Sequence, residues 1–163
     1  MEHIWAPWRM GYIESAKTEE CFLCEHPKQK DDVTNHIIHR GKLNFVILNR
    51  WPYNPGHLMV VPYSHLPDLE KFTDGELQEH WQMVTRCVAG LKTAIQPAGF
   101  NIGINLGKVS GAGVADHVHT HIVPRWEGDV NFMPVVSDTR VIPEGLAATY
   151  EKLKGPLRIA LGG

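Results

Sequence analysis

The chain has 163 residues, of which 43% are hydrophobic and 21% are charged, and these values are typical of a folded globular protein. Its 16 basic and 18 acidic residues give a formal net charge of -2, which argues against a general nucleic-acid coat protein or a polybasic membrane binder. No apolar run approaches the roughly 20 residues that span a bilayer, and the first residues lack the basic start and apolar stretch of a secretory signal. We therefore expect one domain in the cytoplasm, with neither nucleic acid nor membrane as a partner.

The first part of the chain divides into an arm and the start of the folded domain. Residues 1–20 are irregular and rich in tryptophan, so we expect an arm that docks onto the body or onto a second subunit. Residues 21–163 are expected to form the domain. It begins with Cys21 and Cys24, whose spacing suits two thiolates on one metal ion or a redox-active pair. With three cysteines in all, a disulfide framework is a poor interpretation.

Two strands and a long helix are predicted next. Residues 43–49 and 57–61 form an antiparallel hairpin around the turn-rich stretch 50–56. The helix is predicted over Asp74–Ile95, because apolar residues recur there at steps of three and four. We expect this stripe to pack in the core, and its members are Leu77, Trp81, Val84, Val88, Leu91 and Ile95.

The second half of the domain adds two strands and a modest helix. The strands are predicted over 100–106 and 117–124, linked by the glycine-rich stretch 107–113, and the helix over 144–153. Antiparallel strands with one long helix packed on a face make the fold class α+β.

Three histidines alternate along the predicted strand 117–124. His117, His119 and His121 would share one face, with ~6.5–7 Å between neighbours. They could be satisfied structural side chains, or three ligands of one metal ion. The preceding glycine-rich stretch favours phosphate chemistry instead, since its backbone N–H groups can bind an anion. One histidine would then attack phosphorus as a nucleophile while its neighbours donate hydrogen bonds.

The histidine row resembles the signature of the histidine triad (HIT) family, His-x-His-x-His followed by two apolar residues. The resemblance implies an antiparallel HIT-like sheet with one long helix packed on it. It also implies an enzyme that acts at the α-phosphate of an adenine nucleotide. The similarity extends from Cys21 to Trp126 and includes Asn49, Pro55-Gly56-His57, Pro62-Tyr63-Ser64-His65 and Asn105-Leu106-Gly107.

The resemblance implies catalytic roles for the three histidines. His119 matches the family's nucleophile, which carries the nucleotidyl group covalently. His121 matches a position that hydrogen-bonds the phosphate, and His117 completes the triad.

The nucleotide pocket is expected to form around neighbouring strands. Asn49 matches a residue that contacts ribose hydroxyls, while Asn105 and the backbone around Gly113 match phosphate contacts. By strand alternation Ile47 points as Asn49 does, as a wall for the base. Two further residues share a face of the next strand and could complete the pocket, namely His57 and Met59.

A structural zinc ion is implied by the same resemblance. In some similar family members a cysteine pair joins two histidines around zinc, and the matching residues here are Cys21, Cys24, His65 and His117. Two sulfurs and two nitrogens close a tetrahedral site with no open position, so such a zinc ion would be structural. The alternative is a reduced, metal-free cysteine pair.

Two positions before the triad bear on the reaction type. Hydrolytic family members commonly carry Gln and Ser where this chain has Gly113 and Val114. That pattern, with Pro124-Arg125-Trp126 and residues 129–134, looks more like the bacterial diadenosine tetraphosphate phosphorylase branch, although Val114 is not the expected serine. We therefore expect phosphorolysis of dinucleoside polyphosphates, in which inorganic phosphate resolves the covalent intermediate.

Two alternatives stay open. One is a HIT hydrolase of dinucleoside polyphosphates or nucleoside phosphoramidates, and the other is a non-catalytic zinc-containing nucleotide-binding module. Family members pair through the helix and a sheet edge, so a homodimer or a homotetramer is expected.

Overall fold

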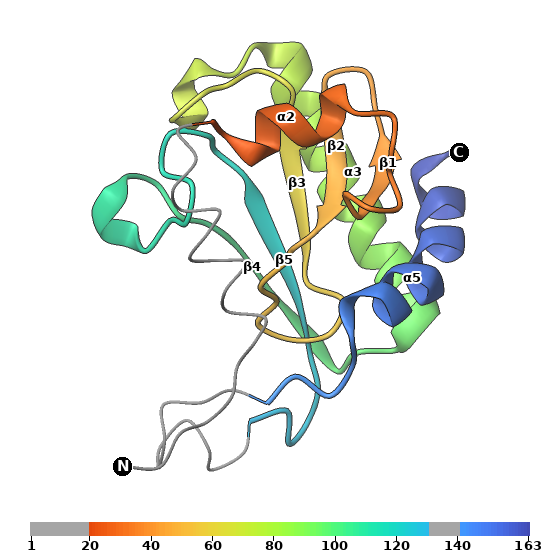
Figure 1. Ribbon diagram of the computed structural model, residues 1–163. Helices are drawn as coiled ribbons and strands as arrows, with labels where there is room; N and C mark the ends of the chain where they lie inside the picture. Colours follow the sequence, from red (N-terminus) through yellow and green to blue (C-terminus); the bar gives the residue numbers. More distant parts are fainter. Residues whose placement is uncertain (1–19, 131–140) are drawn as a thin grey trace.

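A five-stranded antiparallel sheet forms the centre of the protein (Figure 1). The structure is a computed structural model that describes residues 20–130 and 141–163. The predicted arm lies outside these residues except for Glu20, as do residues 131–134 of the segment after the triad. The strands run in the order β1-β2-β3-β5-β4, with the bounds β1 Ile37–Arg40, β2 Asn44–Leu48, β3 Leu58–Pro62, β4 Gly99–Ile104 and β5 Thr120–Arg125.

The predicted hairpin is present as β2 and β3, which pair antiparallel with Ile47 opposite Met59. Both strands are buried along their whole length. Because successive side chains point to opposite faces, each strand feeds two apolar clusters. One cluster contains Val46 and Leu48, and the other contains Phe45 and Ile47.

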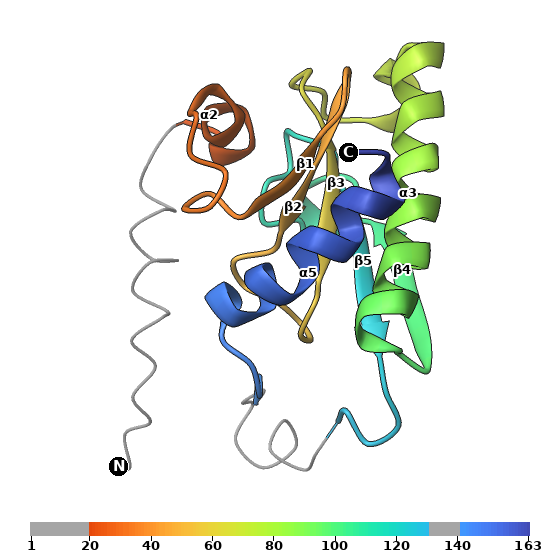
Figure 2. The same ribbon diagram turned by 90° about the vertical axis from the view of Figure 1, so that its right-hand side faces the viewer.

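Helices cover both faces of this sheet (Figure 2). α3 (Asp74–Ile95) and α5 (Leu146–Leu161) lie together on one face, and the short α2 (Phe22–Lys28) lies on the other. Two single 3-10 turns, Leu69–Lys71 and Lys108–Ser110, complete the helical elements within residues 20–130 and 141–163. None of the helices in the described part of the chain is long and apolar enough to cross a bilayer.

The α+β class, with a long helix packed on an antiparallel sheet, is confirmed, and the second predicted helix, α5, packs beside α3 on the same face. The C-terminal helix also continues past its predicted end at Leu153, since the apolar spacing extends through Leu157 and Leu161, which are buried. The two helices meet closely at Gly90, where an added Cβ would lie 2.8 Å from Leu157 Cδ2.

The predicted bounds of α3 are confirmed, and two reciprocal hydrogen bonds, a capping box, close its N-terminus. Thr73 Oγ1 accepts a hydrogen bond from the Glu76 N–H, and the Glu76 carboxylate accepts one from the Thr73 N–H. The predicted core stripe is wrong in this half of the helix, since Leu77 and Trp81 are 39% and 43% exposed. The buried positions there are polar, Glu76 and His80, because both find hydrogen-bond partners beneath the helix.

The strand predicted over 117–124 begins later, at Thr120. Thr120 is the first residue that pairs with both neighbouring strands, opposite Val60 and Ile104. Before it the chain leaves the sheet, and the Val118 N–H donates to the Leu66 carbonyl instead. The three histidines therefore do not form one row on a strand face, and only the third of them belongs to β5.

Candidate active site and metal centre

A hollow of about 650 Å³ opens where the residues before β5 meet the ends of β2 and β3. Six of the predicted catalytic and substrate-binding residues line it, Asn49, Met59, Asn105, Gly113, His119 and His121, together with two of the predicted metal ligands, Cys21 and His65. The described lining contains no lysine or arginine, so an anion bound here meets imidazole, amide and backbone donors. An added Cβ at Gly113 would have nothing within 4 Å, which agrees with open space beside the predicted phosphate contacts.

His119 presents a ring nitrogen with a free lone pair to this hollow. Its Nδ1 lies 2.8 Å from the His117 carbonyl oxygen, which can only accept, so Nδ1 carries the proton. The remaining nitrogen of the neutral ring, Nε2, is then unprotonated. Burial lowers the pKa of His119, which keeps the imidazole neutral near pH 7. Nε2 is therefore equipped to act as a nucleophile.

His121 has the opposite arrangement because of His57. The Tyr53 N–H donates to His57 Nδ1 over 3.1 Å, so the ring proton of His57 lies on Nε2. That Nε2–H faces His121 Nδ1 at 2.9 Å and donates to it. Neutral His121 must then carry its own proton on Nε2, as a hydrogen-bond donor to an anion in the hollow.

Burial reinforces this arrangement of protons. Burial, followed by the neighbouring His121 and His119, lowers the pKa of His57 to about 3. Burial and then His119 lower the pKa of His121 to about 4. Both rings are therefore neutral at pH 7, and the relay from Tyr53 through His57 to His121 determines which nitrogen donates.

The four predicted metal ligands come together beside the hollow. Cys21 Sγ and Cys24 Sγ lie 3.3 and 3.4 Å from His117 Nδ1, and Cys24 Sγ lies 3.2 Å from His65 Nδ1. All four ligand atoms are within 4.8 Å of one another. Zinc in a tetrahedral Cys2His2 site would separate sulfur from nitrogen by about 3.5 Å, given its usual bond lengths. The cluster therefore fits a zinc ion in size and in chemistry.

The second nitrogen of His117 supports this fit. His117 Nε2 donates to the Pro62 carbonyl over 2.9 Å, which leaves Nδ1 unprotonated and directed at the sulfurs. A metal-binding histidine is commonly oriented in this way by an outer hydrogen bond. Nε2 of His117 faces the Pro62 carbonyl and Nδ1 faces the sulfurs, so neither ring nitrogen is directed at a substrate. The buried His117 therefore belongs to the cluster and does not line the hollow. In the metal-free state, burial and the neighbouring Cys21 raise the pKa of Cys24 to about 11.

Two predicted pocket residues lie behind the wall of the hollow. Ile47 is 1% exposed and belongs to the apolar cluster that includes Leu23 of α2, so the helix covers the side that was expected to face a base. His57 is fully buried behind three residues that line the hollow, and hydrogen bonds join it to Asn49, Tyr53 and His121.

Three aromatic residues line the hollow that were not predicted as site residues: Phe22, Trp51 and Tyr53. Phe22 and Trp51 meet edge to face with ring centroids 6.2 Å apart. The Asn49 Oδ1 accepts the Trp51 N–H over 2.9 Å and thereby shapes this turn. The sequence could have indicated Trp51 and Tyr53 as site residues, because they lie in the turn directly after Asn49. Turns lie at the surface, where aromatic side chains are rarely part of the core.

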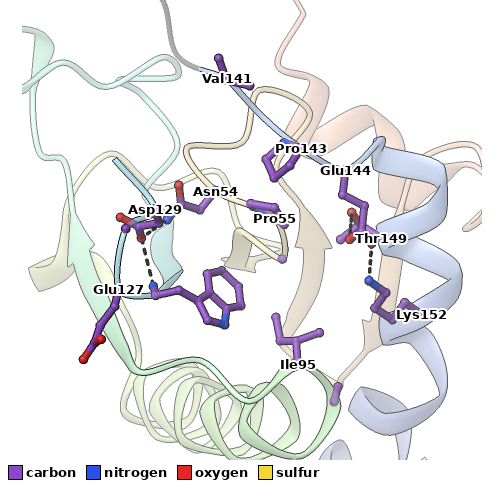
Figure 3. Close-up of a pocket in the computed structure, with 14 residues that line it drawn as sticks. Asn54, Pro55, Ile95, Glu127, Asp129, Val141, Pro143, Glu144, Thr149 and Lys152 are labelled. Carbon is purple, nitrogen blue, oxygen red and sulfur yellow. Dashed lines mark hydrogen bonds and ion pairs between the residues drawn. The ribbon is translucent and has the colours of Figure 1, made fainter. Parts of the chain in front are cut away.

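A second hollow, of about 750 Å³, lies between the end of β5 and the start of α5 (Figure 3). Most of its polar side chains already have hydrogen-bond or ion-pair partners. The Asp129 carboxylate accepts from Asn54 and Arg125, and Glu144 accepts from Thr149 and pairs with Lys152. The triad's hollow differs because His119 and His121 direct one acceptor and one donor into it.

Comparison with known proteins identifies relatives over most of the chain. Residues 30–128 match the HIT domain family. An AP-4-A phosphorylase of Mycobacterium tuberculosis is 39% identical over 163 residues, which cover 94% of this chain and 83% of that protein. An asymmetrical bis(5'-nucleosyl)-tetraphosphatase of Schizosaccharomyces pombe is 33% identical over 129 residues, 76% of this chain and 70% of that protein.

A solved structure provides the corresponding comparison of folds. A Zn-bound histidine triad family protein from Mycobacterium smegmatis superposes with a TM-score of 0.65 at 26% identity, over 88% of this chain and 94% of that one. The comparisons of sequence and of fold thus agree. The chain belongs to the HIT family.

Proposed function

We propose that this protein is an enzyme that splits dinucleoside polyphosphates by phosphorolysis, with diadenosine tetraphosphate as its substrate. The observation that carries the proposal is the pairing of an unprotonated His119 Nε2 with a protonated His121 Nε2 at one hollow. The aromatic rings of Phe22, Trp51 and Tyr53 offer surfaces on which an adenine can stack. The identity to an AP-4-A phosphorylase supports the same substrate class.

In the first step, His119 Nε2 attacks the α-phosphorus of the bound substrate. A P–N bond forms, the bond from that phosphorus to the bridging oxygen breaks, and ATP leaves with the electron pair of that bond. The ring becomes cationic, and its Nδ1–H keeps donating to the His117 carbonyl, a charge-assisted hydrogen bond that stabilises the adduct. His121 Nε2–H donates to the phosphoryl oxygens as their charge grows in the transition state.

In the second step, an oxygen of inorganic phosphate attacks the same phosphorus from the side that ATP has left. A P–O bond forms, the P–N bond breaks, and ADP is released while His119 returns to its neutral form. The products are therefore ATP and ADP. Gly113 leaves room beside the phosphates for this second nucleophile.

We also propose that the cluster of Cys21, Cys24, His65 and His117 holds structural zinc. Four protein ligands leave no coordination position for substrate, so the ion would stabilise the fold around the site and take no part in the transfer. The similarity to a Zn-bound histidine triad family protein supports the choice of metal.

Hydrolysis is the second candidate, favoured by the similarity to an asymmetrical bis(5'-nucleosyl)-tetraphosphatase. In that reaction water replaces phosphate in the second step and releases AMP. Nucleoside phosphoramidates would be resolved through the same adduct. A non-catalytic nucleotide-binding module is less well supported, because binding alone does not require the free lone pair on His119.

The deciding experiment offers diadenosine tetraphosphate to the protein with and without inorganic phosphate and identifies the products. ATP plus ADP, formed only with phosphate, supports phosphorolysis. ATP plus AMP without phosphate supports hydrolysis. The variant His119→Ala should bind nucleotide and show no turnover, and unchanged turnover in that variant would contradict the covalent mechanism.

For the assembly we propose a homodimer, with a homotetramer as the alternative. Leu77 and Trp81 expose apolar surface on α3, and Ile102 is 44% exposed on β4, which is an edge strand. Light scattering should give at least twice the monomer mass, and Trp81→Glu should lower it. A monomeric wild-type protein at micromolar concentration would contradict this assembly.

A further inference from the structure

A buried polar network beneath the sheet begins at a carboxylate on α3. Glu79 Oε2 accepts hydrogen bonds from the Asn44 backbone N–H at 2.7 Å and from Asn44 Nδ2 at 3.1 Å. Asn44 Nδ2 also donates to the Glu76 carbonyl. Since carboxylate and carbonyl oxygens only accept, the amide nitrogen of Asn44 must face them. Its oxygen, Oδ1, therefore points to the other side.

That side is occupied by His80, which is 1% exposed. His80 Nδ1 lies 2.9 Å from Asn44 Oδ1, so Nδ1 carries the ring proton and donates. Nε2 of the neutral ring is then an acceptor, and it lies 2.6 Å from Thr120 Oγ1. The fully buried Thr120 hydroxyl must be the donor of this bond.

Thr120 lies between the two histidines that line the hollow. His119 precedes β5 and has no partner in the strand ladders, whereas Thr120 is the first residue paired on both sides. The Thr120 side chain points away from the hollow, toward α3, where His80 holds its hydroxyl. Thr120 is therefore the residue that links both histidines to the strand ladders and to α3.

We propose that His80 is a positioning residue for the reaction, which fixes Thr120 and through it the relative placement of His119 and His121. The core has no need of a polar pair here, because a leucine and a valine would fill a similar volume without buried polar groups. The network instead joins the first residue of β2, α3 and the first residue of β5 through directional bonds. Its kinetic consequences rest on the proposed function, but its proton arrangement does not.

Matched variants separate the hydroxyl from the volume of the side chain. Thr120→Val removes the donor and keeps the shape, and we expect kcat to fall roughly 10- to 100-fold with KM nearly unchanged, since small misplacements of reacting groups cost this much. Thr120→Ser restores the donor and should restore most of the activity. Thr149→Val removes another buried hydroxyl, on α5 and away from the site, and should leave kcat unchanged.

A second pair of variants tests the ring itself. The amide oxygen of Gln reaches the place of Nε2, so His80→Gln should still accept from Thr120 and retain activity. His80→Asn reaches only Asn44 and should lose as much kcat as Thr120→Val. Because both changes remove the same bond, the double variant His80→Asn/Thr120→Val should lose no more than either single variant. Wild-type kcat in both single variants would overturn the proposal.

Nitrogen-15 NMR of the wild-type protein tests the arrangement without variants or turnover. We expect the ring proton of His80 on Nδ1 and a slowly exchanging Thr120 hydroxyl proton coupled to His80 Nε2. A proton on His80 Nε2 would overturn the proposal even if the variants fail to fold. Should the wild type show no turnover, the proposed function fails, while the NMR result still decides whether His80 holds Thr120.

Discussion

Replacing His57 with phenylalanine tests the relay that places the proton on His121. In the wild type, the Tyr53 N–H occupies His57 Nδ1 and His57 Nε2 donates to His121 Nδ1 over 2.9 Å. Phenylalanine keeps a ring of similar size near Tyr53 and removes both nitrogens. His121 Nδ1 is then free to take the proton. In that tautomer the bare Nε2 lone pair faces the phosphate, and the site loses a donor.

The expected loss of kcat depends on the tautomer ratio of His121, and it stays below the loss caused by removing the donor entirely. A neutral hydrogen bond contributes about 1 kcal/mol net, and losing that bias shifts the tautomer ratio of His121 by a factor of about five. Complete loss of a transition-state donor costs roughly 10²- to 10³-fold in kcat. We therefore expect His57→Phe to lower kcat by about 2- to 5-fold, because a fivefold change in the tautomer ratio lowers the donating fraction of His121 by at most fivefold.

The assay measures the release of ATP and ADP at saturating substrate and phosphate, with the thermal midpoint recorded for each variant. The order should be His57→Phe, then His121→Leu, then His119→Ala, from mildest to most severe. A wild-type rate in His57→Phe would refute the relay. A loss as complete as that of His119→Ala would also refute it, because His57 would then have to contact substrate directly.

Three further predictions concern stability. Chelation of the metal should lower the thermal unfolding midpoint of the wild type and have little effect on the variant Cys24→Ser. Elemental analysis should find no zinc in that variant. Equal midpoints of the wild type with and without chelator would exclude a structural metal. The free energy of unfolding should fall as the pH drops from 6.5 toward 4, because burial lowers the pKa of His80 to about 4 and, together with His121, that of His57 to about 3. Between pH 6.5 and pH 4 the unfolded chain binds protons that the folded chain does not. The variant His80→Gln should therefore show a smaller change of unfolding free energy with pH in urea titrations. An unchanged slope would contradict the reasoning. Gly90→Val should destabilise the fold by about 1–3 kcal/mol through overpacking against α5, measured by urea unfolding, whereas a neutral effect would mean that the two helices can separate there at no cost.

Local spacing predicted the elements whose pattern is strong and uninterrupted. α3 has 22 residues, a capping residue and regular apolar steps, and its bounds were predicted correctly. β1 has four residues, too few for a period to emerge, and α2 contains Pro27, so both were missed. α5 was predicted too short because Gly155 and Pro156 are typical of a helix end, although packing against α3 carries the helix past them.

The residues of the site were predicted more fully than its local geometry. The cluster of cysteines and histidines, and several residues lining the hollow, were predicted from the resemblance to the HIT family. The course of the chain before Thr120 could not be read from alternation, because hydrogen bonds to the Pro62 and Leu66 carbonyls take over where strand pairing ends. The pairing of Asn44 with His80 was also out of reach, since it joins residues 36 positions apart.

The His117 carbonyl links the two halves of the site. It accepts a hydrogen bond from His119 Nδ1–H. The ring of His117 itself lies between the cysteine sulfurs and the Pro62 carbonyl. The reactive ring is therefore oriented by a residue whose own place depends on the cluster. In related chains the four ligand positions should then be kept or lost together. A lineage that abandons the cluster has to acquire a different anchor for residue 117 before its histidine can remain oriented.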